Sequence, residues 1–288
     1  MDYAIVIAFE VVRAIAWLVL LAAGLAIIFG MMKVINFAHG EFLMLGGYTV
    51  VVCTGAGVPQ WISMLVLAPL VVGLFGVAVE RLVIRHLYGR ILDSLLATWG
   101  LSMLMIGGVT LIFGNTVQGV PTPLGSMRIG AYQVPVYNLV QIVFAAAILF
   151  AIWAVLRFTN AGLVARATMQ NPNTAEGMGI RTSRVYMATF GIGSAITGLA
   201  GGLLAPVIGV VPSMGMNLVG QSFITVITGG AAIIAGTLSS ATLLGTISQA
   251  TTFLSGPVYG DAALLIAALI ILRLLPQGIT GRIFKRSL

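Results

Sequence analysis

Residues 185–260 read VYMATFGIGSAITGLAGGLLAPVIGVVPSMGMNLVGQSFITVITGGAAIIAGTLSSATLLGTISQATTFLSGPVYG, and these 76 residues include no Asp, Glu, Lys or Arg. A helix needs about 20 apolar residues to cross the hydrocarbon core of a bilayer, so this stretch is long enough for about three spans. Four more uncharged stretches precede it, at 14–32, 42–79, 94–127 and 129–156. The pattern predicts a protein that crosses a membrane several times.

The composition excludes an ordinary water-soluble protein. Hydrophobic residues make up 59% of the 288-residue chain and charged residues only 7%, whereas charged residues are about 25% of a soluble domain. So much apolar side chain also excludes a disordered chain. The net charge of +7 comes from residues that border apolar segments and form no basic face. Nucleic acid is therefore not an expected partner.

We expect nine spans, with eight as a close alternative, in an all-α polytopic transmembrane helical bundle with broken helices. The expected spans lie in the stretches 14–32 (one), 42–79 (two), 94–127 (one), 129–156 (one), 185–260 (three) and 262–275 (one, interrupted by Arg273). Residues 42–57 are short for a full span. An alternative is therefore that residues 33–57 form a helix broken at mid-membrane.

The placement of Lys and Arg predicts the orientation, because cytoplasmic loops carry an excess of both. If the segments near 33–41, 80–93, 157–184 and 273–288 face the cytoplasm, twelve of the fourteen lie inside. These twelve are Lys33, Arg81, Arg85, Arg90, Arg157, Arg166, Arg181, Arg184, Arg273, Arg282, Lys285 and Arg286, which leaves Arg13 and Arg128 outside. Nine spans, an external N-terminus and a cytoplasmic C-terminus satisfy this bias.

The most polar stretch that borders an apolar span is NFAHGE at 36–41. Asn36, His39 and Glu41 fall within six positions, and Gly40 permits a helix break. Polar groups inside a bilayer are costly and tend to face partners, water or substrate. We expect these three residues to line the inner part of a solute pathway or its gate, and a solvated cytoplasmic turn is the alternative.

A second set of candidates lies in the uncharged tract 185–260. Gln221, Ser222 and Thr225 are polar but uncharged within an apolar helix. Such residues suit the lining of a pathway for a neutral or zwitterionic solute. The alternative is that hydroxyl groups bond back to the carbonyls of their own helix.

The segment 157–184 is the longest of the expected cytoplasmic loops. Residues 163–170 suit a short helix that Asn171 and Pro172 would end. Asn173 suits the cap of a second short helix, with Glu176 three residues later completing a capping box. Two short helices on a membrane face are suited to docking another protein, and an ordinary solvated connector is the alternative.

Several kinds of chemistry are missing from the sequence. A Walker A loop needs Lys followed by Ser or Thr, but Lys33 precedes Val34 and Lys285 precedes Arg286. The chain therefore lacks a standard ATPase site of its own. One cysteine, Cys53, excludes intramolecular disulfides and cysteine-based zinc sites. No catalytic set of residues, metal site or cofactor site is indicated.

Four passages carry a resemblance to a known family. They are 24–26 with NFAHGE at 36–41 and GGY at 46–48; ATWGLS at 97–102 with Phe113 and Gly114; Gly162, Arg166, Ala167, Asn171, Ala175, Gly179 and Ile180; and GLAG at 198–201 with Phe223, Gly229, Gly230, Gly236 and PQG at 276–278. The chain resembles the permease subunit of bacterial ABC importers for branched-chain amino acids and their relatives, which include urea and short-chain amide importers. Trp99 is closer to the urea-type branch.

The resemblance implies that residues 1–288 form a single transmembrane permease domain in the bacterial inner (plasma) membrane. Its expected partners are a second, homologous permease, two cytoplasmic ATP-binding subunits and a periplasmic solute-binding protein. The ATP-binding subunits would dock on the loop 157–184, where Arg166, Asn171, Glu176 and Gly177 are the expected contacts. The chain would not be an enzyme itself. A passive channel for a small neutral solute such as urea, and a secondary transporter driven by protons or sodium, are the rival functions.

Overall fold

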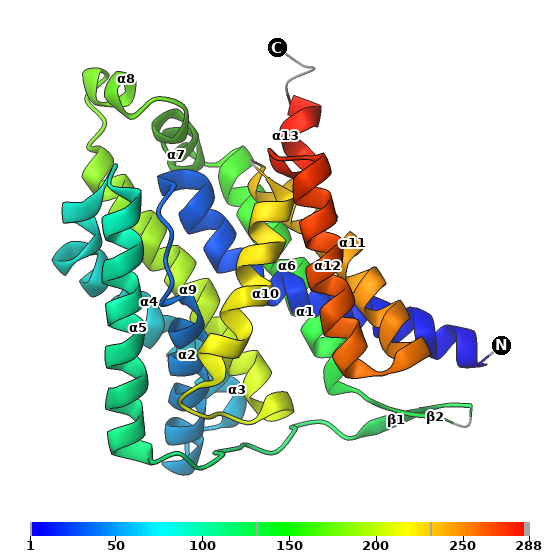
Figure 1. Cartoon of the computed structure of the whole chain (residues 1–288). Helices are drawn as coiled ribbons and strands as arrows, with labels where there is room; N and C mark the ends of the chain where they lie inside the picture. Colours follow the sequence, from blue (N-terminus) through cyan, green and yellow to red (C-terminus); the bar gives the residue numbers. More distant parts are fainter. Residues whose placement is uncertain (1, 131, 231, 285–288) are drawn as a thin grey trace. The chain divides into compact units, whose positions relative to one another are not determined.

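The computed structural model describes residues 2–130, 132–230 and 232–284, and helices account for most of them (Figure 1). In chain order the elements are α1 (Asp2–Met32), α2 (His39–Gly55), α3 (Gln60–Ile62), the π-helix η1 (Ser63–Leu67), α4 (Ala68–Leu82), the 3-10 helix η2 (Ile84–Leu87), α5 (Ile91–Phe113), β1 (Ser126–Ile129), β2 (Tyr132–Pro135), α6 (Tyr137–Phe158), α7 (Asn160–Gln170), α8 (Pro172–Gly177), α9 (Thr182–Ile208), α10 (Met214–Gly229), α11 (Ile233–Ser255), α12 (Pro257–Leu274) and α13 (Gly278–Phe284).

The prediction of a multi-pass, all-α membrane bundle is confirmed. Six helical stretches of the described chain are long and apolar enough to cross a membrane, and the bent pair α10 and α11 makes a seventh. The six are Ile5–Met32, Gln60–Leu82, Ile91–Phe113, Tyr137–Phe158, Thr182–Ile208 and Pro257–Gly281. Every stretch expected to hold spans contains at least one helix, if α2, which has 17 residues, and α10 and α11 are counted separately. The span count depends on how these shorter helices are treated.

The chain divides into two compact units, which are described separately. The first unit contains Met1–Ala22, Thr122–Leu149 and Gln221–Leu288, and the second contains Ala23–Pro121 and Phe150–Gly220.

In the second unit, α9 packs along α4 and α2. Small residues allow this contact, because helix backbones approach closely only where side chains are short. A Cβ atom added at Gly46 would meet the carbonyl oxygen of Gly198 at 2.3 Å, and one added at Gly201 would meet that of Leu43 at 2.0 Å. These helices therefore meet backbone to backbone.

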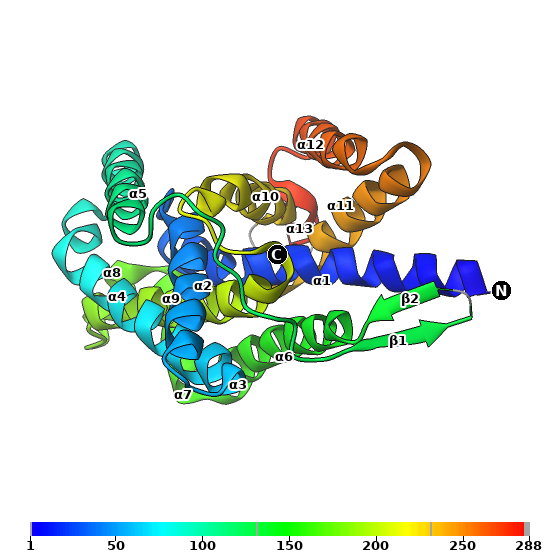
Figure 2. The same cartoon turned by 90° about the horizontal axis from the view of Figure 1, so that it is seen from below.

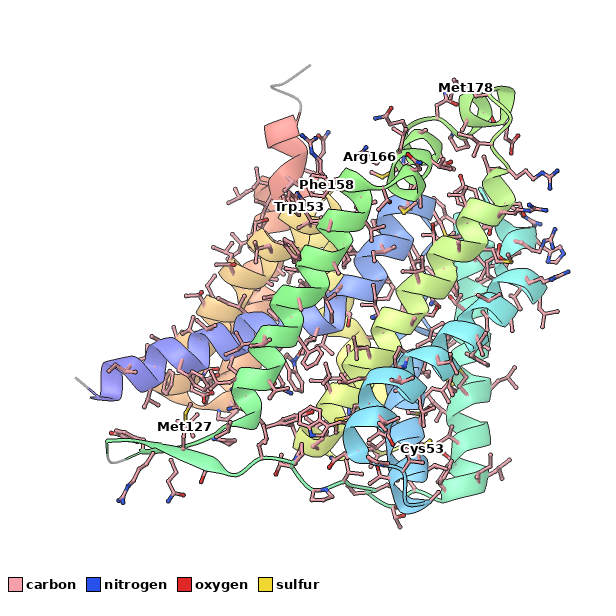
Figure 3. All side chains as sticks on the ribbon, turned by 180° about the vertical axis from the view of Figure 1, so that it is seen from behind. Cys53, Met127, Trp153, Phe158, Arg166 and Met178 are labelled. Atoms are coloured by element: carbon pink, nitrogen blue, oxygen red, sulfur yellow. The ribbon has the colours of Figure 1, made fainter. Side chains whose placement is uncertain are left out.

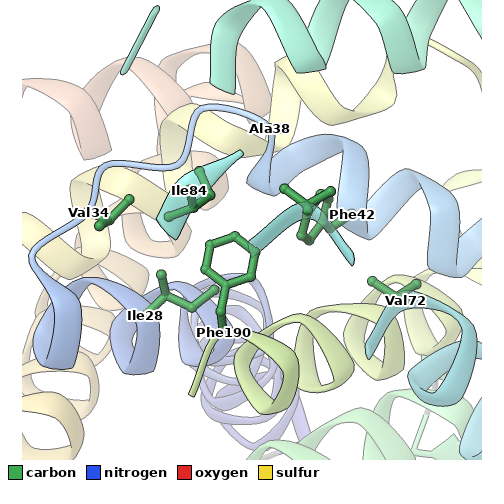
Figure 4. Close-up of a cluster of buried hydrophobic side chains, with 8 residues drawn as sticks. Ile28, Val34, Ala38, Phe42, Val72, Ile84 and Phe190 are labelled. Atoms are coloured by element: carbon green, nitrogen blue, oxygen red, sulfur yellow. The ribbon is translucent and has the colours of Figure 1, made fainter. Parts of the chain in front are cut away.

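A cluster of buried aliphatic and aromatic side chains packs beside this contact (Figure 4). Phe42 of α2 meets Phe190 of α9 edge to face, with 6.2 Å between the ring centroids. Ile28 of α1 and Val72 of α4 are fully buried in the same cluster. The cluster ties the last part of α1 and the first turn of α2 to α9.

In the first unit, α11 packs against α12 and α13. The helices α10 and α11 are bent by 114° at their junction. The hydroxyl group of Thr280 in α13 donates to the carbonyl oxygen of Gly229 at 2.6 Å and accepts from the amide of Ala232 at 3.3 Å. One side chain thus satisfies backbone groups on both sides of the break.

A β-hairpin is the departure from an all-helical chain. The strands β1 and β2 pair antiparallel, with Met127 opposite Val134, and the narrow ribbon they form leads into α6 (Figure 2). Gly130 in the turn has a φ of 59°, a conformation that glycine adopts without strain. The prediction of an all-α bundle did not include this hairpin.

Candidate functional site

The NFAHGE run lies where the chain breaks between α1 and α2. Helix α1 ends at Met32, and Lys33 adopts a positive φ of 51°, the left-handed conformation that commonly ends helices. Residues 33–38 are non-helical, and α2 begins at His39. The expected break therefore lies at residues 33–38, whereas residues 39–55 form one unbroken helix, and a position of the break at mid-membrane stays a prediction.

The break between α1 and α2 lies beside the interior of α9, not beside its end. The hydroxyl group of Thr189 lies 3.7 Å from the sulfur of Met31, and that of Thr197 lies 3.5 Å from Nδ1 of His39. The two threonines are eight positions apart in α9, which corresponds to about 12 Å at 1.5 Å per residue. Residues 33–38 therefore run back along α9, and α2 begins beside the middle of this spanning helix.

Backbone groups of the break are satisfied by its own asparagine and by α5. The side-chain oxygen of Asn36 accepts a hydrogen bond from the amide of Ala38 at 3.1 Å, and the amide of Phe37 donates to the hydroxyl of Thr98 at 3.1 Å. Unpaired backbone groups are expensive in lipid, so these bonds make the break possible. The role of Thr98 was not predicted, although Thr98 and Ser102 stand four residues apart on one buried face of α5.

His39 and Glu41 are both buried in the first turn of α2, with 0% and 1% of their surfaces exposed. Within the described chain, neither carboxyl oxygen of Glu41 has a hydrogen-bond partner of good geometry, although Ser102 is a polar neighbour. Gly40 lies against the backbone of Gly215, because a Cβ atom there would meet the Gly215 carbonyl oxygen at 2.1 Å. The structure thus brings Asn36, His39 and Glu41 together, but packs them inside the second unit.

The second group of candidates lies on α10 in the first unit. Thr225 donates to the carbonyl oxygen of Gln221 at 2.7 Å, which is the bond back to its own helix considered as the alternative. Ser222 and Thr225 are fully buried. Gln221 differs from both, because it accepts from the indole of Trp17 at 3.2 Å and donates to Asp261 at 3.5 Å. It joins three helices.

The segment 157–184 forms two short helices, as expected. The hydroxyl of Thr159 accepts from the amide of Gly162 and begins α7. A Cβ atom at Gly162 would meet the carbonyl oxygen of Val155 at 2.2 Å, so the chain can double back only with glycine there. Figure 3 shows Arg166 and Met178 at one end of the second unit and Cys53 at the other.

The capping of α8 corrects the prediction for this loop. Asn171, not Asn173, is the N-cap, and its side chain accepts from the amide of Thr174 at 3.1 Å. The physical reason is Pro172, which has no amide hydrogen and a φ suited to the first helical position. Glu176 accordingly does not close a capping box; its carboxylate accepts a hydrogen bond from Thr182 at the start of α9.

The surface of this loop is a mixture of polar and apolar side chains. Asn171, Glu176 and Gly177 are exposed and Arg166 is half-buried. Leu163 and Met178 are exposed by 59% and 65%. Ala175 is fully buried and anchors α8.

An aromatic contact supports the base of α9 beside this loop. Tyr88, just after η2, packs edge to face against Tyr186, with 5.0 Å between the ring centroids. Its hydroxyl group donates a hydrogen bond to the carboxylate of Glu80. Burial, followed by that hydrogen bond and the carboxylate charge, raises the pKa of Tyr88 above its usual range. The phenol therefore stays a neutral donor at physiological pH.

Nothing in the described residues suggests chemistry at a metal, because no group of three or more His, Cys, Asp or Glu side chains could hold an ion there. Apolar spanning helices, a polar helix break beside the middle of α9 and a capped two-helix loop define the class of the protein. It is a multi-pass membrane protein.

Comparison with known proteins identifies the family. The model of the family described as "Branched-chain amino acid transport system / permease component" matches residues 7–274, and the chain belongs to this family. Among curated proteins it is 26% identical to the high-affinity branched-chain amino acid transport system permease protein LivH of Salmonella typhimurium, with 91% of each chain covered.

Two further relatives agree with this family. BraD of Pseudomonas aeruginosa, also a high-affinity branched-chain amino acid permease protein, is 26% identical over 91% of each chain. A probable branched-chain amino acid transport permease protein of Methanocaldococcus jannaschii is 28% identical, with 93% of this chain and 90% of its own covered. No solved structure shows a significant match. None of these three relatives is described as a urea or amide permease.

Proposed function

We propose that the protein is the permease subunit of an ATP-binding-cassette importer and forms half of the path for branched-chain amino acids. ATP hydrolysis occurs on two cytoplasmic partner subunits, a second homologous permease completes the path, and a periplasmic binding protein delivers the solute. The family supports the transport role, and the absence of a Walker A lysine from the sequence agrees with separate ATPases.

The observation that carries this proposal is the construction of the loop 157–184. Its two helices begin at side-chain caps, Thr159 and Asn171, and therefore present a defined surface. Leu163 of α7 and Met178 after α8 expose apolar side chains in the same loop as the charged Glu176. Exposed apolar patches with a polar surround mark protein interaction sites. Arg166, Asn171, Glu176 and Gly177 are our proposed contacts with the ATP-binding subunits.

The positive-inside bias supports an orientation in which this loop and the C-terminus face the cytoplasm. In the proposed mechanism, closure of the ATPase pair pushes on α7 and α8, and α8 transmits the force to α9 through the bond between Glu176 and Thr182. Because α2 begins beside Thr197 of α9, the polar break with Asn36, His39 and Glu41 moves with α9 and acts as the inner gate. Gln221, Ser222 and Thr225 belong to the pathway in the first unit.

A glycine substitution tests the docking surface with little change to the fold. A Cβ atom at Gly177 meets no atom within 4 Å, so a larger side chain alters the surface alone. In proteoliposomes that contain the whole importer, we expect Gly177→Leu to lower leucine uptake about tenfold, equivalent to ~1.4 kcal/mol of lost docking energy. The matched control is Gly55→Leu, also exposed with open space, at the end of α2.

Membrane insertion and yield of both variants should equal those of the unmodified protein. Equal uptake by Gly177→Leu and Gly55→Leu would remove α8 from the docking surface. Uptake by the permease alone, without ATP or partners, would favour a passive channel, and uptake abolished by an ionophore while ATP is retained would favour a secondary transporter.

A further inference from the structure

One charged side chain stands apart from the features used so far. Asp261 lies near the start of α12, and from 185 to 272 the sequence contains no other Asp, Glu, Lys or Arg. The two ion pairs of the described residues are formed by other acids. Asp261 is exposed in the isolated chain. An ionisable group within a spanning helix is costly in lipid and usually marks a functional site.

A chain of two hydrogen bonds leads to this carboxylate. The indole of Trp17 can only donate, so it holds the side-chain oxygen of Gln221 at 3.2 Å and turns the amide nitrogen of Gln221 towards Asp261. The distance from that nitrogen to Oδ1 of Asp261 is 3.5 Å, much longer than the ~2.8 Å of a good charge-assisted bond. The carboxylate is oriented but weakly satisfied.

Exposed apolar residues share the face of α12 on which Asp261 lies. Val258 and Leu265 lie three residues before and four residues after it, on the same face of α12, and are exposed by 79% and 46%. An aliphatic amino acid carries an ammonium group and an apolar side chain. A carboxylate beside aliphatic side chains can bind both. The ammonium group would pair with the acid, and the branched side chain would lie on the apolar face.

The depth of this group within α12 can be estimated. Arg273 lies twelve residues after Asp261, at the other end of the helix, which is about 18 Å along the axis. Because we propose that the end with Arg273 is cytoplasmic, Asp261 lies about 6 Å from the outer end of α12. A solute released by a periplasmic binding protein would meet it early.

We propose that Asp261, oriented by Gln221 and Trp17, binds the α-ammonium group of the amino acid as it enters the path. This proposal rests on the importer function and specifies the chemistry of one site in it. The site selects zwitterionic amino acids over analogues of the same shape that carry no amine. Trp17 is a positioning residue and does not contact the ammonium group.

The test uses the complete importer in proteoliposomes and photo-leucine, a leucine analogue with a light-activated diazirine. We expect labelling of peptides from α1, α10 or α12 that excess leucine prevents and 4-methyl-2-oxopentanoate, which lacks the amine, does not. Asp261→Asn should lower this labelling about 30-fold, as expected for the loss of one charged partner. Asp261→Glu should restore most of it.

The matched control is Asp93→Asn, because Asp93 is a half-buried aspartate near the start of α5 that pairs with Arg90. Labelling of the control should equal that of the unmodified importer. Undiminished labelling of Asp261→Asn would overturn the proposal. Loss of the second permease from purified Asp261→Asn complexes would also overturn it, because Asp261 would then be a subunit contact. ATP-dependent leucine uptake by the unmodified importer tests the proposed function separately.

Discussion

The two helix breaks of this protein satisfy their backbone hydrogen-bonding groups in different ways. Between α1 and α2, backbone groups are satisfied by Asn36 within the break and by Thr98 of α5, and Gly40 packs against the backbone of Gly215. Between α10 and α11, the hydroxyl of Thr280 serves both Gly229 and Ala232. The first break depends on close packing and the second on one side chain. They should therefore fail for opposite reasons, the first when atoms are added and the second when a hydroxyl is removed.

The largest effect is expected where an added atom meets backbone. In Gly40→Ala, the new methyl group would lie 2.1 Å from the carbonyl oxygen of Gly215, and neither backbone segment can move without disturbing the α2 packing. We expect a loss of about 3 kcal/mol or more in stability, at the upper end of overpacking effects. The measurement is the thermal unfolding midpoint, with the monodisperse yield, of the purified protein in detergent.

Gly100→Ala on α5 is the control for this substitution, because a Cβ atom there meets nothing within 4 Å. It should leave the midpoint unchanged or raise it slightly, since alanine favours helix over glycine. If the two variants unfold at the same temperature, the close approach of α2 to Gly215 is not a structural requirement.

The sequence predicted the helices far better than the contacts between them. The uncharged stretches located the spans because apolar length is a property of the sequence itself. The polar run 36–41 likewise indicated a break, but Gly40 lies inside α2 and allows a close backbone contact, not the break itself. What the sequence could not supply was the partner across the break. Thr98 is 61 residues from Phe37, and its spacing with Ser102 indicates a polar face without showing what the face meets.

Contacts were also hard to predict from the sequence in the loop 157–184 and in the first unit. The sequence predicted Asn173 as the cap of α8, but Pro172 occupies the first helical position and makes Asn171 the cap instead. Asp261 was visible as an isolated acid in the sequence, but its link to Gln221 and Trp17 joins residues 40 and 204 positions apart. Contacts of that range depend on the tertiary fold.

An intermediate effect is expected at the second break. Thr280→Val keeps the shape of the side chain but removes the hydroxyl, so the carbonyl of Gly229 and the amide of Ala232 both lose their partner. Two unsatisfied backbone groups in apolar surroundings should cost about 2 kcal/mol. The thermal unfolding midpoint in detergent measures this, and Thr280→Ser, which retains the hydroxyl, should lie close to the unmodified protein.

Thr280→Val also tests whether the second break relies on one residue. Limited proteolysis should cut this variant faster near the junction of α10 and α11 than it cuts the unmodified protein, because an unsatisfied junction opens more often. An unchanged midpoint together with unchanged cleavage would mean that Gly230 and Gly278, whose backbones are in close contact, hold the junction without the hydroxyl.

The smallest effect is expected for the hydroxyl at the first break. Thr98→Val leaves one amide, that of Phe37, without its acceptor, while Asn36 and the packing of Gly40 remain. The expected loss is about 1 kcal/mol, detectable as a lower unfolding midpoint. The control is Thr110→Val, whose hydroxyl donates only to Ile106 in its own helix at 2.7 Å and whose loss should cost less than about 0.5 kcal/mol. If Thr98→Val instead lowered the unfolding midpoint as much as Thr280→Val, the first break would also depend on a single hydroxyl group. The two breaks would then not differ in what stabilises them.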